Sequence, residues 1–251
     1  MTGQALSEDL WTAAERARLA VLAREIEEVR TAARTVAHDE FHGLGPIERP
    51  LDWSLLGQVA TEVARLLQRA GVLETEDVRR VAGPLAGPPA LATLIAWGTG
   101  HLRPAPFECA ALAWAVVRLA LPPFLRGRRD DLSMDASERG TCPECRGAPD
   151  LAILDPARGA RLLICATCDA HWRFDRVRCP CCGNVTGETL ATLAGGPRGY
   201  SIRACDQCGS YLKTIDRRLR AGAEAPLLLR MLTVEMDLAA QEAGYHPGAA
   251  A

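Results

Sequence analysis

Four short cysteine turns lie close together in the second half of this 251-residue chain. In each turn two residues separate a pair of cysteines, and the turns are CPEC (142–145), CATC (165–168), CPCC (179–182) and CDQC (205–208). This spacing lets both sulfurs of a turn reach one ion, and two turns complete a tetrahedral site. The segment between paired turns is too short to bury a core of its own, so its folding needs the metal.

The segments between the turns repeat one pattern. LAILDPARGARLLI (151–164) and TLATLAGGPRGYSI (189–202) each place two apolar runs around a turn that contains Pro and Gly, which predicts a β-hairpin. A further strand-like segment follows each second turn, AHWRF (170–174) and SYLKTI (210–215). The repeat predicts two tandem rubredoxin-like or zinc-ribbon modules, at 141–176 and 177–216.

The matching hairpins also predict which turns share an ion. The first turn is expected to pair with the second and the third with the fourth, because each hairpin brings its own flanking turns together. Four thiolates suit iron and zinc equally, so the sequence does not choose between the two metals. Cys181, the extra cysteine in the CPCC turn, occupies a middle position that points away from the ion. It is expected to be unligated and the most exposed thiol near either centre.

The rest of the chain is predicted to be helical, which gives an α+β protein. Helices are expected at 5–38, from Asp52 or Ser54 to Gly71, and at 76–83, 89–98 and 107–120. These elements define an α-helical domain at 1–125, followed by a polar linker at 126–140. A C-terminal helix at 225–244 is expected to pack on the helical domain through its apolar face.

The N-terminal sequence lacks the basic start and unbroken apolar run of a signal peptide, which predicts a cytoplasmic protein. Thiols stay reduced in that compartment, so ten cysteines indicate metal or redox chemistry before disulfides. The most apolar segment, CAALAWAVVRLAL (109–121), is too short to span a bilayer and contains Arg118. No membrane span is therefore predicted.

Three other features compete for a functional role. HDEFH (38–42) resembles a helical zinc-protease motif, but Asp39 stands where that motif needs a glutamate base, so a solvated helix end is the better interpretation. His171 follows Cys168 closely, yet four cysteines already fill that shell, which favours a surface histidine. Cys109 is interpreted as a small buried hydrophobe in an apolar helix.

Charge and composition leave two alternatives to a protein-binding role. The formal net charge is −2, and the basic excess between 142 and 220 is offset by the thiolates of two loaded centres. A zinc-ribbon protein that binds nucleic acid is therefore disfavoured, also because few aromatic residues are present for base stacking. A redox protein that uses the cysteine turns as dithiols lacks the βαβ setting that such motifs usually occupy.

CATCDAHWRFDRVRCPCC (165–182), followed by CDQCGSYLK (205–213), resembles the family of the formate dehydrogenase accessory protein FdhE. The resemblance covers roughly 140–215. It implies a maturation factor that is not an enzyme, binds the catalytic subunit of formate dehydrogenase before export and is needed for its activity. It also implies two rubredoxin-like centres that hold iron. Carried over by position, the ligands would be Cys142, Cys145, Cys165 and Cys168 in the first, and Cys179, Cys182, Cys205 and Cys208 in the second.

One departure from rubredoxin-like turns concerns the residue after each second cysteine. Glycine is usual there, because the backbone turns with a positive φ. Gly183 and Gly209 fit this requirement, whereas Arg146 and Asp169 occupy the equivalent positions of the first centre. We therefore expect the second centre to be the more regular and the tighter metal site.

Overall fold

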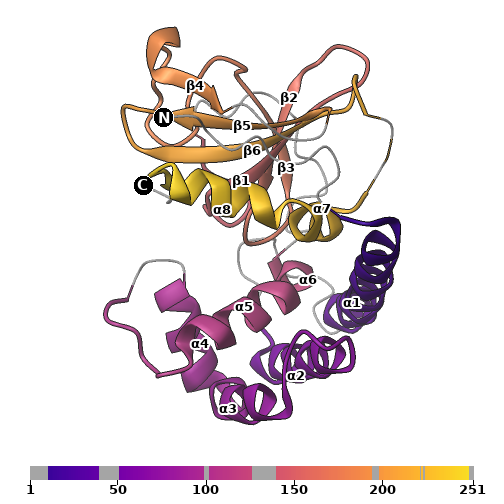
Figure 1. Cartoon of the computed structure of the whole chain (residues 1–251). Coiled ribbons are helices and arrows are strands. Elements are labelled where there is room, and N and C mark those ends of the chain that lie inside the picture. The colour runs from indigo at the N-terminus through magenta and orange to yellow at the C-terminus, as the bar shows by residue number, and fades with distance from the viewer. Residues whose placement is uncertain are drawn as a thin grey trace. The chain divides into compact units, whose positions relative to one another are not determined.

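A computed structural model describes residues 11–39, 51–98, 102–125, 140–193, 198–220, 222 and 224–248 (Figure 1). The chain folds into two compact units, one of residues 20–130 and one that combines residues 131–251 with the first 19. The first unit is helical and the second contains a sheet, so the predicted α+β class is confirmed. No helix in the described ranges is long and apolar enough to cross a membrane.

Six helices precede the first strand in the described ranges. The predicted helices are found, and their ends differ by a few residues except at the first: α1 begins at Ala13 rather than at residue 5, and residues 5–10 lie outside the described residues. They are α1 (Ala13–Asp39), α2 (Trp53–Arg69), α3 (Thr75–Leu85), α4 (Pro88–Gly98), α5 (Ala110–Ala120) and the short α6 (Pro122–Leu125).

Local signals fix both ends of α2. The Asp52 carboxylate accepts a hydrogen bond from the backbone N–H of Leu55 at 2.8 Å, which caps the first turn. After Arg69 the chain turns at Gly71, whose φ of +73° ends the helix. Of the two N-cap candidates in the sequence, Asp52 and Ser54, the structure has Asp52, and Gly71 ends the helix as predicted.

The core of the helical unit lies along one face of α2. Leu56, Val63 and other apolar residues of this face are buried, and α2 packs against α3 and α5. Gly57 allows the close approach of α3, because a Cβ at this position would lie 2.7 Å from the carbonyl oxygen of Leu85. The amphipathic pattern in the sequence thus has its expected packing role.

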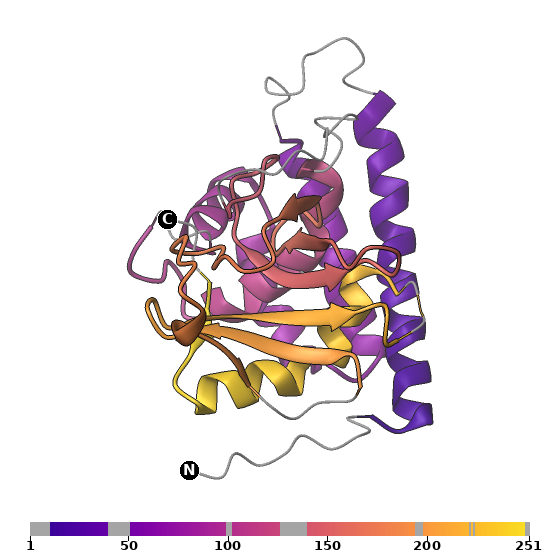
Figure 2. The ribbon, with the colours of Figure 1, turned by 90° about the horizontal axis from the view of Figure 1, so that it is seen from above.

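Two three-stranded ribbons form the sheet of the other unit (Figure 2). In each ribbon the middle strand pairs antiparallel with the other two, and a hairpin precedes the second cysteine turn. The first ribbon consists of β1 (Pro149–Leu154), β2 (Arg161–Cys165) and β3 (His171–Phe174). The second consists of β4 (Leu190–Leu193), which follows the 3-10 turn η1 (Gly187–Thr189), β5 (Tyr200–Cys205) and β6 (Ser210–Asp216).

The two ribbons share one sheet, which the sequence does not predict. β1 pairs with β6 in parallel, from Leu151 opposite Lys213 to Leu154 opposite Asp216, and the strand order becomes β3-β2-β1-β6-β5-β4. β7 (His246–Pro247) pairs with the first residues of β6. Because β1 and β6 both begin just after a cysteine turn and run in the same direction, the two cysteine-rich ends lie at the same end of the sheet.

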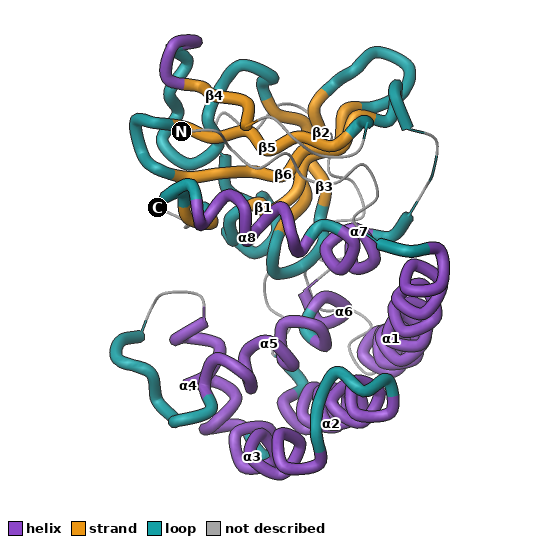
Figure 3. Tube along the Cα trace, viewed as in Figure 1, coloured by secondary structure: helices purple, strands orange, loops and turns teal. Residues whose placement is uncertain are grey.

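The C-terminal segment forms two helices rather than one. α7 (Pro226–Leu232) and α8 (Val234–Glu242) are separated at Thr233, whose side-chain hydroxyl donates to the carbonyl oxygen of Leu229 at 2.7 Å. The sequence predicts a single helix at 225–244 that packs on the helical domain. The buried residues of α7 and α8 instead pack on the sheet of their own unit. Figure 3 shows α8 running alongside this sheet.

Apolar contacts hold these helices to the sheet. Leu229 of α7 packs with Leu151, Ile164 and Ile215, so it covers strands of both ribbons. Met236 and Ala240 of α8 pack on the second ribbon with Ile202, Ala204 and Tyr211. The apolar stripe that the sequence assigns to the helical domain therefore completes the core of the sheet.

Three hydrogen bonds also hold α8 and the N-terminal segment in this unit. The Lys213 ammonium, almost fully buried, donates to the Asp237 carboxylate at 2.6 Å, and the Tyr211 hydroxyl donates to the other oxygen at 2.8 Å. The Trp11 indole N–H donates to the carbonyl oxygen of Leu232 at 2.9 Å. These contacts explain why the first residues of the chain fold with its second half.

Arg230 of α7 makes several polar contacts to the sheet. Its guanidinium binds both oxygens of Asp150 at 2.7 and 3.0 Å, Asp169 at 2.5 Å and the carbonyl oxygen of Cys165 at 2.8 Å. Burial opposes the charge on Arg230, but the two carboxylates outweigh it and raise the pKa of the guanidinium. Arg230 thus ties α7 to β1 and to the second cysteine turn.

Replacing Arg230 by methionine should lower the free energy of unfolding by about 3 kcal/mol, because two partly buried carboxylates lose their counter-ion. Denaturant unfolding of the metal-loaded protein measures this change. The matched control is Arg173→Met on the exposed face of β3, which should have little effect. An equal loss in the two variants would contradict the role given to Arg230.

Candidate metal centres

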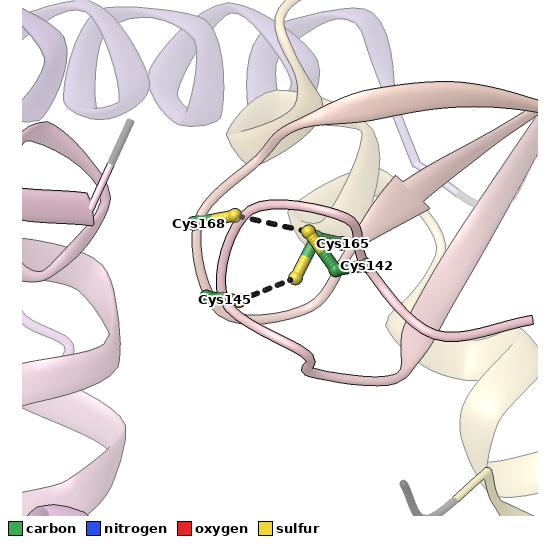
Figure 4. A group of neighbouring side chains, drawn as sticks. All are labelled: Cys142, Cys145, Cys165 and Cys168. Carbon is green, nitrogen blue, oxygen red and sulfur yellow. Dashed lines mark hydrogen bonds between the residues drawn. The ribbon is translucent and has the colours of Figure 1, made fainter. Parts of the chain in front are cut away.

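The first group of cysteines joins the first turn to the second (Figure 4). The Sγ atoms of Cys142 and Cys168 are 3.5 Å apart, and those of Cys145 and Cys165 are 3.4 Å apart. All four sulfurs lie within 4.8 Å of one another. Cys142, Cys165 and Cys168 are buried and Cys145 is half-buried, so this group is well enclosed.

The second group joins the third turn to the fourth. The Sγ atoms of Cys179 and Cys208 are 3.8 Å apart, and those of Cys182 and Cys205 are 3.7 Å apart. These four sulfurs also lie within 4.8 Å of one another. Cys182 is exposed, so this group lies closer to solvent than the first. The structure therefore brings the turns together in sequential order along the chain.

The geometry of both groups suits a four-coordinate ion. Zinc–sulfur bonds of about 2.3 Å in a tetrahedron place the sulfurs about 3.8 Å apart. The closest pairs are separated by 3.4 to 3.8 Å, and a disulfide would need about 2.05 Å. All of these cysteines are free thiols. Each group could therefore hold one metal ion.

All four turns have the same backbone geometry. The residue after each second cysteine donates its N–H to the carbonyl oxygen of the first cysteine, over 2.8 to 3.3 Å. The φ angle at that residue is positive in every turn: +65° at Arg146, +58° at Asp169, +76° at Gly183 and +70° at Gly209. The turn requires the left-handed conformation even where glycine is absent, so the first group bears a strain that the second avoids.

The crowded thiols of the first group perturb one another. Hydrogen bonds from Cys145, Cys165 and Cys168 lower the pKa of Cys142, which takes the thiolate form most readily. Hydrogen bonds with Cys142, Cys145 and Cys165 raise the pKa of Cys168 instead, and burial raises it further. A metal ion that binds here must displace the protons of these thiols, so binding is coupled to proton release.

Two residues near the second group are not predicted from the sequence. The Asn184 side-chain amide lies 3.6 Å from the Cys205 sulfur and donates to the Thr189 hydroxyl at 2.6 Å. The Ser210 hydroxyl lies 3.0 Å from the Cys208 sulfur. Both side chains are buried and can stabilise thiolate charge. The sequence feature that could have identified Asn184 and Ser210 is their position, because each lies two residues after the last cysteine of a turn.

Cys181 is not part of the second group, but its surroundings differ from the prediction. It is half-buried, whereas Cys182 is exposed, so the expectation that Cys181 is the most exposed thiol is wrong. The C-terminal segment explains the burial: a Cβ at Gly248 would lie 2.5 Å from the Cys181 sulfur. A hydrogen bond to Cys179 and burial both raise the pKa of Cys181, which disfavours the reactive thiolate.

Among the described residues, none of the competing features belongs to either group of sulfurs. Cys109 is half-buried rather than buried, and its sulfur lies 3.2 Å from the carbonyl oxygen of Arg80. His171 is half-buried on β3 and is absent from both groups of sulfurs. In the HDEFH segment, residues 40–42 lie outside the described residues.

Sequence comparisons match about half of the chain to FdhE proteins. The chain is 35% identical over 108 residues to a Protein FdhE homolog of Aquifex aeolicus, which covers 41% of this chain and 38% of the relative. It is 31% identical over 147 residues to the homolog of Stutzerimonas stutzeri, and this match covers 56% of this chain and 45% of the relative. The matches thus span less than half of these relatives. No protein-family model matches the sequence.

The fold resembles a solved structure over almost the whole chain. The crystal structure of the FdhE protein from Pseudomonas aeruginosa matches with a TM-score of 0.58 and 20% sequence identity. The match covers 97% of this chain and 95% of that one. The likeness shows a common fold that includes the helical unit, for which the sequence alone provides no family signature.

Replacing Arg146 by glycine should increase the metal affinity of the first group about tenfold, because it removes the cost of a side chain in the left-handed conformation. The reverse change, Gly183→Ala, should weaken the second group by a similar factor, since the new Cβ meets no atom within 4 Å and adds only strain. Competition with a chelator measures each affinity in chains whose other group is disabled by Cys→Ser substitutions. Unchanged affinity in both variants would refute the argument from φ.

Replacing Cys181 by serine should leave two metal ions per chain, whereas replacing the adjacent Cys182 should remove one. The reason is that only Cys182 belongs to the second group of sulfurs. Elemental analysis of the purified variants gives the metal content directly. Loss of an ion from the Cys181 variant alone would show that Cys181 is the ligand of this turn.

Proposed function

We propose that this protein belongs to the FdhE family and is a formate dehydrogenase accessory protein. Similarity to FdhE proteins over about half of the chain and a fold shared with an FdhE crystal structure support this proposal. In this role it binds the catalytic subunit of formate dehydrogenase in the cytoplasm and is needed for the activity of that enzyme. It performs no turnover itself. The observation that carries the proposal is the pair of four-cysteine groups built into one sheet.

Two metal ions are proposed to have a structural role. Cys142, Cys145, Cys165 and Cys168 would bind one ion, and Cys179, Cys182, Cys205 and Cys208 the other. Each ion, iron or zinc, would fix two turns whose short strands cannot bury a core of their own. β1 and β6 begin at the same end of the sheet. The ions would hold this end in one conformation that is ready to bind a partner.

A genetic experiment tests the accessory role. Deletion of the gene should abolish formate dehydrogenase activity and leave unrelated enzymes unaffected, and the wild-type gene should restore the activity. A chain with Cys142→Ser and Cys179→Ser should fail to restore it, because each group loses one sulfur. Cys109→Ser is the matched control, since Cys109 belongs to neither group, and should restore activity fully.

A binding experiment tests the partner directly. The immobilised, metal-loaded protein should retain the formate dehydrogenase catalytic subunit. Full formate dehydrogenase activity in the deletion strain would refute the proposal. Retention of the protein on a DNA column at physiological salt would favour the nucleic-acid alternative. An absorption spectrum of protein purified without air identifies the metal, because ferric thiolate centres are coloured and zinc centres are not.

A further inference from the structure

A cavity of about 500 Å³ lies beside the second cysteine group. One wall is formed by residues of β4, β5 and β6, and another by the segment 176–181, which leads from the first ribbon into the third cysteine turn. Cys179 and Cys205 form part of the lining, as do the apolar side chains of Val177, Leu190 and Leu212. This volume is within the range of small-molecule sites.

The charge of the cavity is of one sign. Arg161, Arg176, Arg178 and Arg203 line it, and no aspartate or glutamate is among the lining residues. A concave surface with several cations and no anion concentrates a positive potential that attracts anions. Part of the arginine excess in this half of the chain thus lines the cavity.

Arg161 is the buried member of this group. Only 5% of its surface is exposed, and its Nη1 atom donates to the carbonyl oxygens of Asp175 at 3.1 Å and Arg178 at 3.0 Å. These bonds fix the segment that forms the cavity wall. The Nε and Nη2 atoms of Arg161 make no hydrogen bond to the described residues, so the guanidinium retains donors for a ligand.

Two other arginines are also incompletely paired within the described ranges. The Nε atom of Arg178 is buried without a hydrogen bond and forms only a long ion pair with the Asp175 carboxylate, at 3.9 Å. Arg203 donates to the Thr192 hydroxyl at 2.7 Å and forms no ion pair with a described residue. Unsatisfied buried donors are costly, and an anion in the cavity would relieve that cost.

A simpler explanation is that these arginines offset the negative charge of the second metal centre. Four thiolates with one divalent ion carry a net charge of −2, and Cys179 is close enough to Arg161 to interact with it. However, none of the arginines that line the cavity donates a hydrogen bond to a cysteine sulfur of the described residues. The metal centre therefore leaves their directional donors unused.

We propose that this cavity binds a small organic phosphate. A phosphate monoester carries nearly two charges and three acceptor oxygens. It therefore matches the guanidinium groups of Arg161, Arg178 and Arg203 better than a carboxylate with its single charge does. The apolar wall would contact the organic part of the ligand. This inference goes beyond the proposed accessory role and stands independently of it.

Calorimetric titration of the full-length, metal-loaded protein with phenyl phosphate tests the proposal. Saturable binding of one molecule per chain is expected, and it should be tighter than the binding of inorganic phosphate or of phthalate, a dicarboxylate of similar size. Arg203→Gln should weaken phenyl phosphate binding about tenfold, because one charge-assisted contact is lost. Arg203 is exposed, so this substitution should leave the fold intact.

Arg173→Gln is the matched control, because it removes the same charge from an exposed position outside the cavity and should leave binding unchanged. If both variants bind phenyl phosphate equally weakly, the loss of affinity comes from the change in net charge alone, and the proposal is overturned. Absence of saturable binding would also overturn it and leave the arginines as counter-charges of the metal centre. Equal affinity for phthalate would overturn the assignment to a phosphate.

Discussion

The parallel pairing of β1 with β6 is the contact on which the architecture of the cysteine-rich unit depends. Each ribbon alone would present its outer strand to solvent, and an exposed strand edge is prone to aggregation. The pairing closes one edge of each ribbon against the other. Because the paired strands run in the same direction, both cysteine groups come to lie at one end of the sheet. Leu229 of α7 then covers the seam, since it contacts strands from both ribbons.

At Asp169 an unfavourable backbone conformation accompanies a favourable side-chain contact. Its φ of +58° is unfavourable for any residue with a side chain, and the hydrogen bond from its N–H is the longest of the four turns at 3.3 Å. Its carboxylate, however, binds Arg230, which also binds Asp150 and the carbonyl oxygen of Cys165. Glycine would relax the backbone and leave Arg230 with one carboxylate fewer. Arg146, exposed at the equivalent place in the first turn, has no such partner among the described residues.

The sequence predicts those features that depend on neighbouring residues. Asp52 and Gly71 bound α2 as expected, both hairpins form where apolar runs flank a Pro/Gly turn, and the turns pair in sequential order. Features that depend on distant contacts were missed or wrong. An apolar stripe at 225–244 predicts burial but does not identify the surface that buries it. Cys181 is covered by a segment more than sixty residues away in the chain, and the arginine cavity combines residues from both ribbons. The domain boundaries at 125, 140, 176 and 216 remain predictions.

The shared sheet changes what the internal repeat means. A duplicated motif suggests two interchangeable modules, each of which could be moved, lost or exchanged separately. Here the first strand of one copy and the last strand of the other are hydrogen-bonded neighbours, and a helix beyond both copies covers the seam. A cut between the copies would leave each half with an open strand edge and an uncovered apolar face. The two repeats are therefore not separate structural modules. The unit that can be transferred intact is the pair of ribbons together with α7 and α8.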